Sequence, residues 1–122
     1  MKAELKGIVS TEFSYPFEQF YPEDERSFGM TVQLLVGPKG ENSSEIFDLL
    51  ICSPDWIKTE YAHQGYTWGT NILILLEYDF FLIKECIERY ISLCAGENWA
   101  DLAYQISKIG GWEFENYRPL IE

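Results

Sequence analysis

The period of the apolar pattern changes along the chain, and this change most constrains the fold. Residues 3–9 and 28–36 alternate between apolar and polar side chains, and residues 46–52 form a further apolar run, as expected for strands. From residue 83 to residue 94 the apolar residues instead recur at spacings of three and four, as on one face of a helix. The sequence therefore predicts an α+β fold with most strands before the long helices.

The strands are expected to pair mainly in antiparallel fashion. Residues 28–36 and 46–52 flank the polar segment 37–42, which has the composition of a turn, so these two strands should form a hairpin. The run at 71–78 is apolar on both faces and is predicted to be a central strand. Alternation at 112–117 indicates a last strand.

Helix boundaries are marked by capping residues. Ser53 followed by Pro54 is typical of a helix start, so a short helix is predicted over 54–62. The helix at 83–94 should be followed by another that begins at Asn98. We therefore expect a single domain over residues 1–122, with a largely antiparallel sheet of about four to five strands, a short helix after strand three and two packed helices in the C-terminal half.

Acidic residues are in excess and unevenly placed. Nine Lys and Arg oppose twenty Asp and Glu, which gives a net charge of −11. Residues 12–25 contain no basic residue but include five aromatic side chains, Pro16 and Pro22. The prolines disfavour a regular element, so we interpret the segment as an ordered loop whose aromatics pack inward and whose carboxylates remain in water. Its acids are Glu12, Glu18, Glu23, Asp24 and Glu25.

The charge also narrows the classes of partner. Nucleic acid and anionic membranes both carry phosphates that repel an acidic surface, so neither is expected to bind. No secretory signal is visible, and the most apolar stretch, 72–76, is far too short to span a bilayer. Three cysteines at unrelated spacings, all among apolar neighbours, are interpreted as buried free thiols. These features predict a cytoplasmic protein with a basic partner.

Few residues suggest catalysis, and no metal or other cofactor is expected. His63 is the single histidine, and the sequence has neither a Cys-x-x-Cys pair nor a phosphate-binding glycine loop. Two carboxylate pairs, Glu113 with Glu115 and Glu77 with Asp79, stand two residues apart and should share a strand face. Such pairs can hydrolyse glycosides, but they also protect exposed strand edges, and no polarising group is evident beside them. The chain is therefore predicted not to be an enzyme.

Several segments resemble the immunity protein 8 family over nearly the whole chain. They are Lys2 to Ile8, residues 28–40, residues 47–56 and residues 112–117. The most specific parts are Cys-x-Pro-x-Trp at 52–56 and Trp-Glu-Phe-Glu at 112–115. The resemblance implies a role in bacterial polymorphic-toxin or contact-dependent inhibition systems, where an immunity protein binds a toxic C-terminal domain. It brings no catalytic residues, and its motifs do not by themselves assign Trp56 or Trp112 to an interface.

Together, charge and resemblance predict a noncatalytic inhibitor of a cognate toxin domain. Many such toxins are nucleases, whose basic grooves attract an acidic inhibitor and speed association. The residues expected to bind the toxin are Glu18, Glu23, Asp24, Glu25, Glu60, Tyr66, Trp68, Glu77 and Asp79. An alternative is an acidic DNA mimic that blocks a DNA-binding protein, and a weaker one is a small enzyme that uses a carboxylate pair. The oligomeric state is left open.

Overall fold

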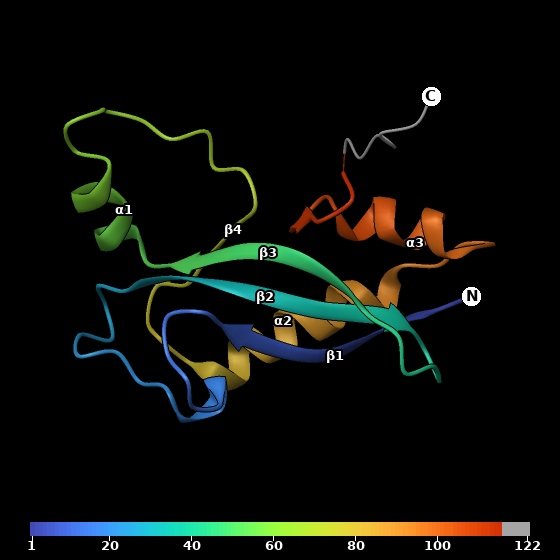
Figure 1. The fold of residues 1–122 in the computed structure, drawn as a ribbon. Helices are drawn as coiled ribbons and strands as arrows, with labels where there is room; N and C mark the ends of the chain where they lie inside the picture. Colours follow the sequence, from blue (N-terminus) through green and yellow to red (C-terminus); the bar gives the residue numbers. More distant parts are fainter. Residues whose placement is uncertain (116–122) are drawn as a thin grey trace.

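A computed structural model describes residues 1–115, which form a five-stranded sheet with helices packed against it (Figure 1). The strands are β1 (Ala3–Ser10), β2 (Gly29–Pro38), β3 (Glu45–Cys52), β4 (Ile72–Ile74) and β5 (Gly111–Trp112). The helices are the 3-10 turn η1 (Phe17–Gln19), α1 (Pro54–Glu60), α2 (Phe80–Leu93) and α3 (Trp99–Ile106). The predicted α+β class is confirmed.

The sheet has the order β1-β2-β3-β4, and β5 lies on the same side of β3 as β4. Strands β2 and β3 form the predicted antiparallel hairpin, in register from Gly29 opposite Cys52 to Val36 opposite Glu45. The β3–β4 pair is parallel, whereas β1 pairs antiparallel with β2 and β5 pairs antiparallel with β3. The expectation of a largely antiparallel sheet is therefore confirmed.

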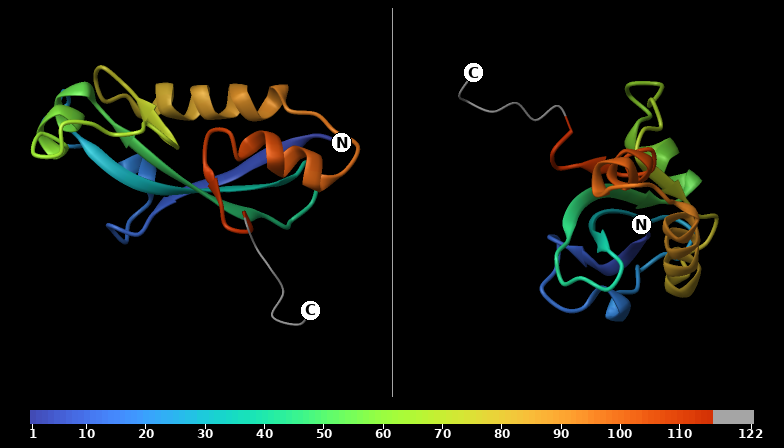
Figure 2. Two further views of the ribbon diagram at one scale, coloured as in Figure 1. Left: turned by 90° about the horizontal axis from the view of Figure 1, so that it is seen from above. Right: turned by 90° about the vertical axis from the view of Figure 1, so that its right-hand side faces the viewer.

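One face of the sheet carries the hydrophobic core. Alternate residues of β2 and β3 are buried, together with one stripe of α2 and one stripe of α3. Figure 2 shows α2 lying along the sheet, with α3 beside it. Burial of apolar area at this interface is the main stabilising contribution. The fully enclosed side chains include Val32, Leu34, Val36, Phe47, Ile51, Ile83, Leu102 and Ile106.

Each of the three α-helices begins at a capping side chain, whereas η1 has none. The Ser53 hydroxyl accepts a hydrogen bond from the Trp56 amide and Asn98 from the Asp101 amide, which confirms both predicted caps. Helix α1 ends at Glu60 rather than at residue 62. None of the helices in residues 1–115 is long and apolar enough to cross a membrane.

The prediction of a central strand over 71–78 was wrong. Strand β4 covers only Ile72–Ile74 and lies at the edge of the sheet, and the chain leaves the sheet after Leu75. Leu75 is buried, but Ile74 and Leu76 are exposed. The apolar run cannot reveal this, because burial on both faces requires layers of structure that only the tertiary fold supplies.

Two smaller expectations also need correction. The predicted strand at 112–117 is limited to Gly111–Trp112, and Glu113 to Glu115 follow as a turn; residues 116 and 117 lie outside the described residues. Of the three cysteines, Cys52 and Cys94 are buried, but Cys86 is exposed on α2. It falls outside the buried stripe of Ile83, Ile87 and Ile91.

The strand directions bring three connections to one end of the sheet. Ser10, Gly29, Cys52 and Ile74 all lie at this end, because each pairs with a neighbour there. The connections at residues 11–28, 53–71 and 75–79 therefore start from the same end, on the left of Figure 1. Every residue predicted to bind the toxin belongs to one of these three segments.

Candidate functional site

The connection at residues 11–28 is built on stacked aromatic rings, and the three phenylalanines of its 12–25 segment pack inward as predicted, whereas Tyr15 and Tyr21 are exposed. The ring of Phe13 stacks on Phe20 with centroids 4.9 Å apart and on Tyr15 at 4.6 Å. Phe17 is buried beneath them and contacts Phe80 at the start of α2, with centroids 5.6 Å apart. The rings anchor the loop to the core, so its carboxylates project into solvent from a fixed frame.

The end of this loop is joined to the segment before α2. The backbone N–H of Tyr78 donates a hydrogen bond of 2.7 Å to the Glu25 carbonyl, and the Tyr21 hydroxyl donates one of 2.8 Å to the Glu25 carboxylate. The rings of Tyr21 and Tyr78 meet edge to face, with centroids 5.5 Å apart. Two segments more than fifty residues apart in sequence are thus locked together.

This junction concentrates negative charge. The hydrogen bond to Glu25 raises the pKa of Tyr21, and partial desolvation and the charges of Glu25, Glu77 and Asp79 raise it further. The acids of two separate segments therefore act on the same phenol. Asp79 also caps α2, because its Oδ1 accepts a hydrogen bond of 3.2 Å from the Leu82 amide. Glu77 is exposed and makes no such bond within the described chain.

All nine predicted binding residues are exposed, but they do not form one cluster. Glu23, Asp24 and Glu25 lie on the loop that meets Glu77 and Asp79 at the Tyr21–Tyr78 junction. Glu18 faces a groove between β1 and α2.

Glu60, Tyr66 and Trp68 belong to the crossover from β3 to β4, which projects on the other side of the sheet end (Figures 1 and 2). Trp68 is 87% exposed, as its place among the residues expected to bind the toxin requires.

A groove beside β4 was not anticipated from the sequence. It is lined by residues 73–79 together with Leu82 and Cys86 of α2. Leu76, 80% exposed, lies directly before Glu77. The signal that could have revealed this groove is Asp79 as a helix cap, since a helix start there leaves little room for a strand through residue 78.

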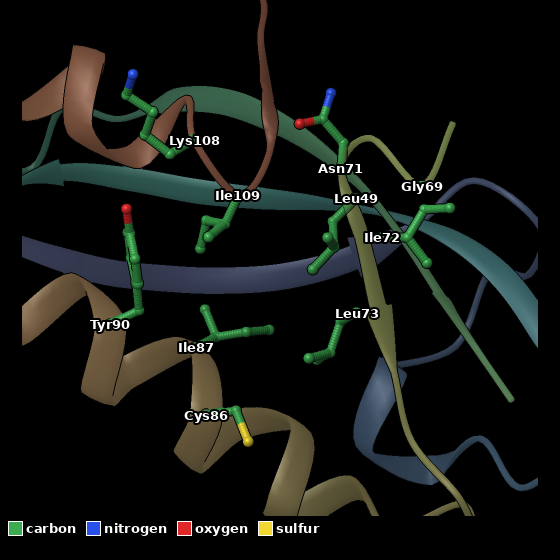
Figure 3. Close-up of a pocket in the computed structure, with 10 residues that line it drawn as sticks. All are labelled: Leu49, Gly69, Asn71, Ile72, Leu73, Cys86, Ile87, Tyr90, Lys108 and Ile109. Carbon is green, nitrogen blue, oxygen red and sulfur yellow. The ribbon is translucent and has the colours of Figure 1, made fainter. Parts of the chain in front are cut away.

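A second cavity lies between β4, α2 and the end of α3 (Figure 3). Its lining is mostly aliphatic, with Asn71 and Lys108 among the few polar groups. The Lys108 amine points away from the cavity and lies 3.0 Å from the Tyr104 hydroxyl. The Tyr90 hydroxyl donates to the Gln105 carbonyl at 2.9 Å. This arrangement brings no acid–base pair together.

The described residues offer little for catalysis. No group of three His, Cys, Asp or Glu side chains within residues 1–115 is placed to hold a metal ion. Burial raises the pKa of the Cys52 thiol to about 11 and also raises that of Cys94, which disfavours the reactive thiolate.

Glu113 and Glu115 do not share a strand face as predicted, because both follow β5 in a turn. The Glu113 carboxylate instead accepts a hydrogen bond from the Ile46 amide.

The two most distinctive sequence segments serve the fold. In the segment 52–56, Ser53 is fully buried and links α1 to β2, since its Oγ accepts a 3.1 Å hydrogen bond from the Phe28 amide. In the segment 112–115, the Trp112 indole N–H donates a 2.8 Å hydrogen bond to Glu45 and its ring stacks on Phe47. These motifs hold the sheet together and leave the exposed loops to other residues.

Comparison with known proteins identifies the family of the chain. No curated protein and no solved structure matches the chain. A model of the family described as immunity protein 8 matches residues 3–117, nearly the whole length. The chain therefore belongs to the immunity protein 8 family, which supports a toxin-neutralising immunity role.

Proposed function

We propose that this protein neutralises its cognate bacterial toxin by binding the toxin's C-terminal domain in the cytoplasm, as a single noncatalytic domain. The convergence of the 11–28 loop and residues 77–79 at the Tyr21–Tyr78 junction is the observation that supports this most directly. It presents carboxylates from two segments in a fixed arrangement. Such a surface suits a basic partner, and a nuclease groove built to hold phosphate is one.

Charge complementarity is expected to act mainly on the rate of association. Opposite potentials steer two proteins toward the correct encounter, and added salt weakens this steering. An immunity protein benefits from speed, because free toxin damages the cell before it is captured. Exposed aromatic side chains such as Trp68 and Tyr66 would then slow dissociation by burying area at the interface.

The test begins with the toxin-domain gene expected immediately upstream in a polymorphic-toxin or contact-dependent inhibition locus. Co-expression of that domain with this chain should give a complex that survives size-exclusion chromatography. Absence of both the gene and a complex would contradict the proposal. Loss of toxin activity on mixing the purified proteins would support inhibition by occlusion.

Charge reversal then tests the acidic loop. Changing Glu23, Asp24 and Glu25 to Lys should slow association about tenfold or more at low salt, with a smaller effect at high salt. The matched control reverses Glu41, Glu85 and Glu97, which are exposed, lie outside these loops and give the same change in net charge. Equal slowing by both variants would mean that only total charge matters and that the loop is not part of the interface.

A further inference from the structure

The groove beside β4 exposes apolar side chains next to acidic ones. It has a volume of about 480 Å³ and lies between residues 73–79 and the first two turns of α2. Leu76 is 80% exposed, and Ile74 and Leu82 are 51% and 43% exposed. Three large aliphatic side chains so close together are costly to leave in water unless a partner covers them. Glu77 and Asp79 border the same groove.

Strand β4 also leaves one edge unpaired within residues 1–115. Its only strand neighbour there is β3. The Leu75 amide donates to the Cys52 carbonyl at 3.0 Å, and the Asn71 carbonyl accepts from the Leu50 amide at 3.0 Å, so the odd-numbered residues face β3. Because backbone groups alternate along a strand, those of Ile72 and Ile74 point away from β3. They are available to an added strand.

The opposite edge of the sheet, formed by β1, is better protected than the edge formed by β4. Strand β1 carries the exposed Glu4 and the salt bridge of its carboxylate with Lys6 at 2.7 Å, and its register is broken between Leu5 and Gly7. Charges and bulges of this kind prevent unwanted strand pairing. β4 has neither a charge nor a proline within Ile72–Ile74. Of these two edges, the β4 edge is therefore the one that lacks such protection within residues 1–115.

We infer that an extended segment of the cognate toxin adds to the free edge of β4 as a further strand. This inference rests on the proposed function and names the surface by which the toxin is held. Side chains of the added strand that face α2 would fill the groove against Leu82 and Cys86 and cover Leu76. A Lys or Arg of the same segment would meet Glu77 at its rim.

Charge selects the toxin over a second copy of this chain as the occupant. The groove is bordered by Glu77 and Asp79, and the Glu25 carboxylate lies at the adjoining Tyr21–Tyr78 junction. With a net charge of −11, two copies would bring like charges together at this edge. A basic toxin segment would neutralise them instead.

The first test uses the unmodified protein in complex with the toxin domain encoded upstream. Hydrogen exchange at the Ile74 amide and alkylation of Cys86 by N-ethylmaleimide should each slow about tenfold or more on complex formation. Cys86 suits this experiment because it lines the groove and is the one exposed thiol, whereas Cys52 and Cys94 are buried. If a stable complex forms but the Ile74 amide exchanges and Cys86 is alkylated as fast as in the free protein, the inference is overturned and the proposed function still stands. If no complex forms, both fail.

Variants then separate side-chain burial from backbone pairing. Leu76→Ala should speed dissociation about tenfold, whereas Leu93→Ala should leave it within about twofold. Leu93 is a matched control, because it is 77% exposed at the other end of α2. Equal effects of the two substitutions would overturn the assignment of the groove.

Ile74→Pro removes the outward-facing N–H, which an edge strand tolerates, and Ile74→Ala keeps it. The proline variant should bind the toxin domain more weakly than the alanine variant, with folding of both checked by circular dichroism. Equal affinities would exclude strand addition. Light scattering of the free chain provides the remaining check, since a dimer dissociated by Leu76→Ala would show that a second copy occupies the groove and would overturn the inference.

Discussion

The indole ring of Trp56 covers Gly29 so closely that a methyl group on Gly29 would overlap it. This contact holds α1 against the start of β2. Gly29→Ala should therefore lower the free energy of unfolding by about 1–3 kcal/mol, measured by urea denaturation. Gly7→Ala is the control, because its methyl group would lie at an ordinary distance of 3.6 Å from Leu35. A smaller loss at Gly29 than at Gly7 would contradict the packing described.

The Ser53 hydroxyl combines a cap with a buried tertiary hydrogen bond. Because it accepts from both the Phe28 and Trp56 amides, Ser53→Ala would leave a buried donor unpaired and should lower the free energy of unfolding by about 1–3 kcal/mol. Asn98→Ala removes only an exposed cap and should lower it by about 1 kcal/mol or less. Thermal and urea unfolding of the two variants would check this order, and its reversal would exclude a structural role for the Phe28 link.

The hydroxyl of Tyr78 is buried and has no hydrogen-bond partner among the described residues. Tyr78→Phe should therefore maintain or raise the free energy of unfolding, since it removes a polar group whose desolvation is not compensated. Tyr90→Phe is the matched substitution, because the Tyr90 hydroxyl donates to Gln105, and it should lower stability by about 1 kcal/mol. Urea denaturation of both would decide, and a clear loss in Tyr78→Phe would show that its hydroxyl is paired.

Burial makes the fold sensitive to alkaline pH, most strongly at two sites. Desolvation raises the pKa of Cys52 from 9.0 to about 11 and that of Tyr78 from 10.0 to about 12. The unfolded chain therefore loses these protons at lower pH than the folded chain. Their contribution to stability is complete below pH 9 and declines as pH rises toward 12.

Urea denaturation at pH 8 to 11.5 measures this loss of stability. Steps of about half a pH unit resolve the titrations of the two groups. Because Tyr78→Phe removes one of the two groups, this variant should lose less stability than the unmodified chain above about pH 10. Equal losses of stability in the unmodified chain and in Tyr78→Phe would show that Tyr78 has the same pKa in the folded and unfolded states.

Trp68 tests whether the crossover loop belongs to the toxin interface. Trp68→Ala should change the free energy of unfolding by less than about 0.5 kcal/mol, because the side chain contributes almost nothing to the core. If the loop binds the toxin, dissociation should become about tenfold faster. Tyr104→Ala, an exposed aromatic on α3, is the control for binding. Surface plasmon resonance with the toxin domain measures the dissociation rates of both variants. An unchanged dissociation rate for Trp68→Ala would remove this loop from the interface.

Local sequence patterns predicted which segments form strands and helices better than they predicted where each strand lies in the sheet. The hairpin of β2 and β3 and the caps at Ser53 and Asn98 depend on nearby residues, and all of them appear as expected. The run at 72–76 suggested a central strand because it is apolar throughout, yet its position at the edge is fixed by the crossover and by α2. Such long-range arrangements have no local signature.

The candidate surface was predictable in the same limited sense. Charge and turn composition correctly indicated that the acids of residues 12–25 are exposed, and glycines around Trp68 indicated an exposed loop. The meeting of Tyr21 with Tyr78 could not be read from the sequence, because it joins segments that become neighbours only when the sheet is complete. The groove beside Leu76 was missed for that reason.

Because three connections gather at one end of the sheet, the residues that form the core are separate from the exposed residues available to a partner. The strands, α2, α3 and the motif residue Trp112 form the scaffold, and Ser53 ties α1 to it, while the connections at 11–28, 53–71 and 75–79 extend from it together. Loops on a rigid scaffold accept changes in length and sequence at little cost to stability. Evolution can therefore retarget such a protein to a new toxin by rewriting its loops, while the architecture is inherited intact.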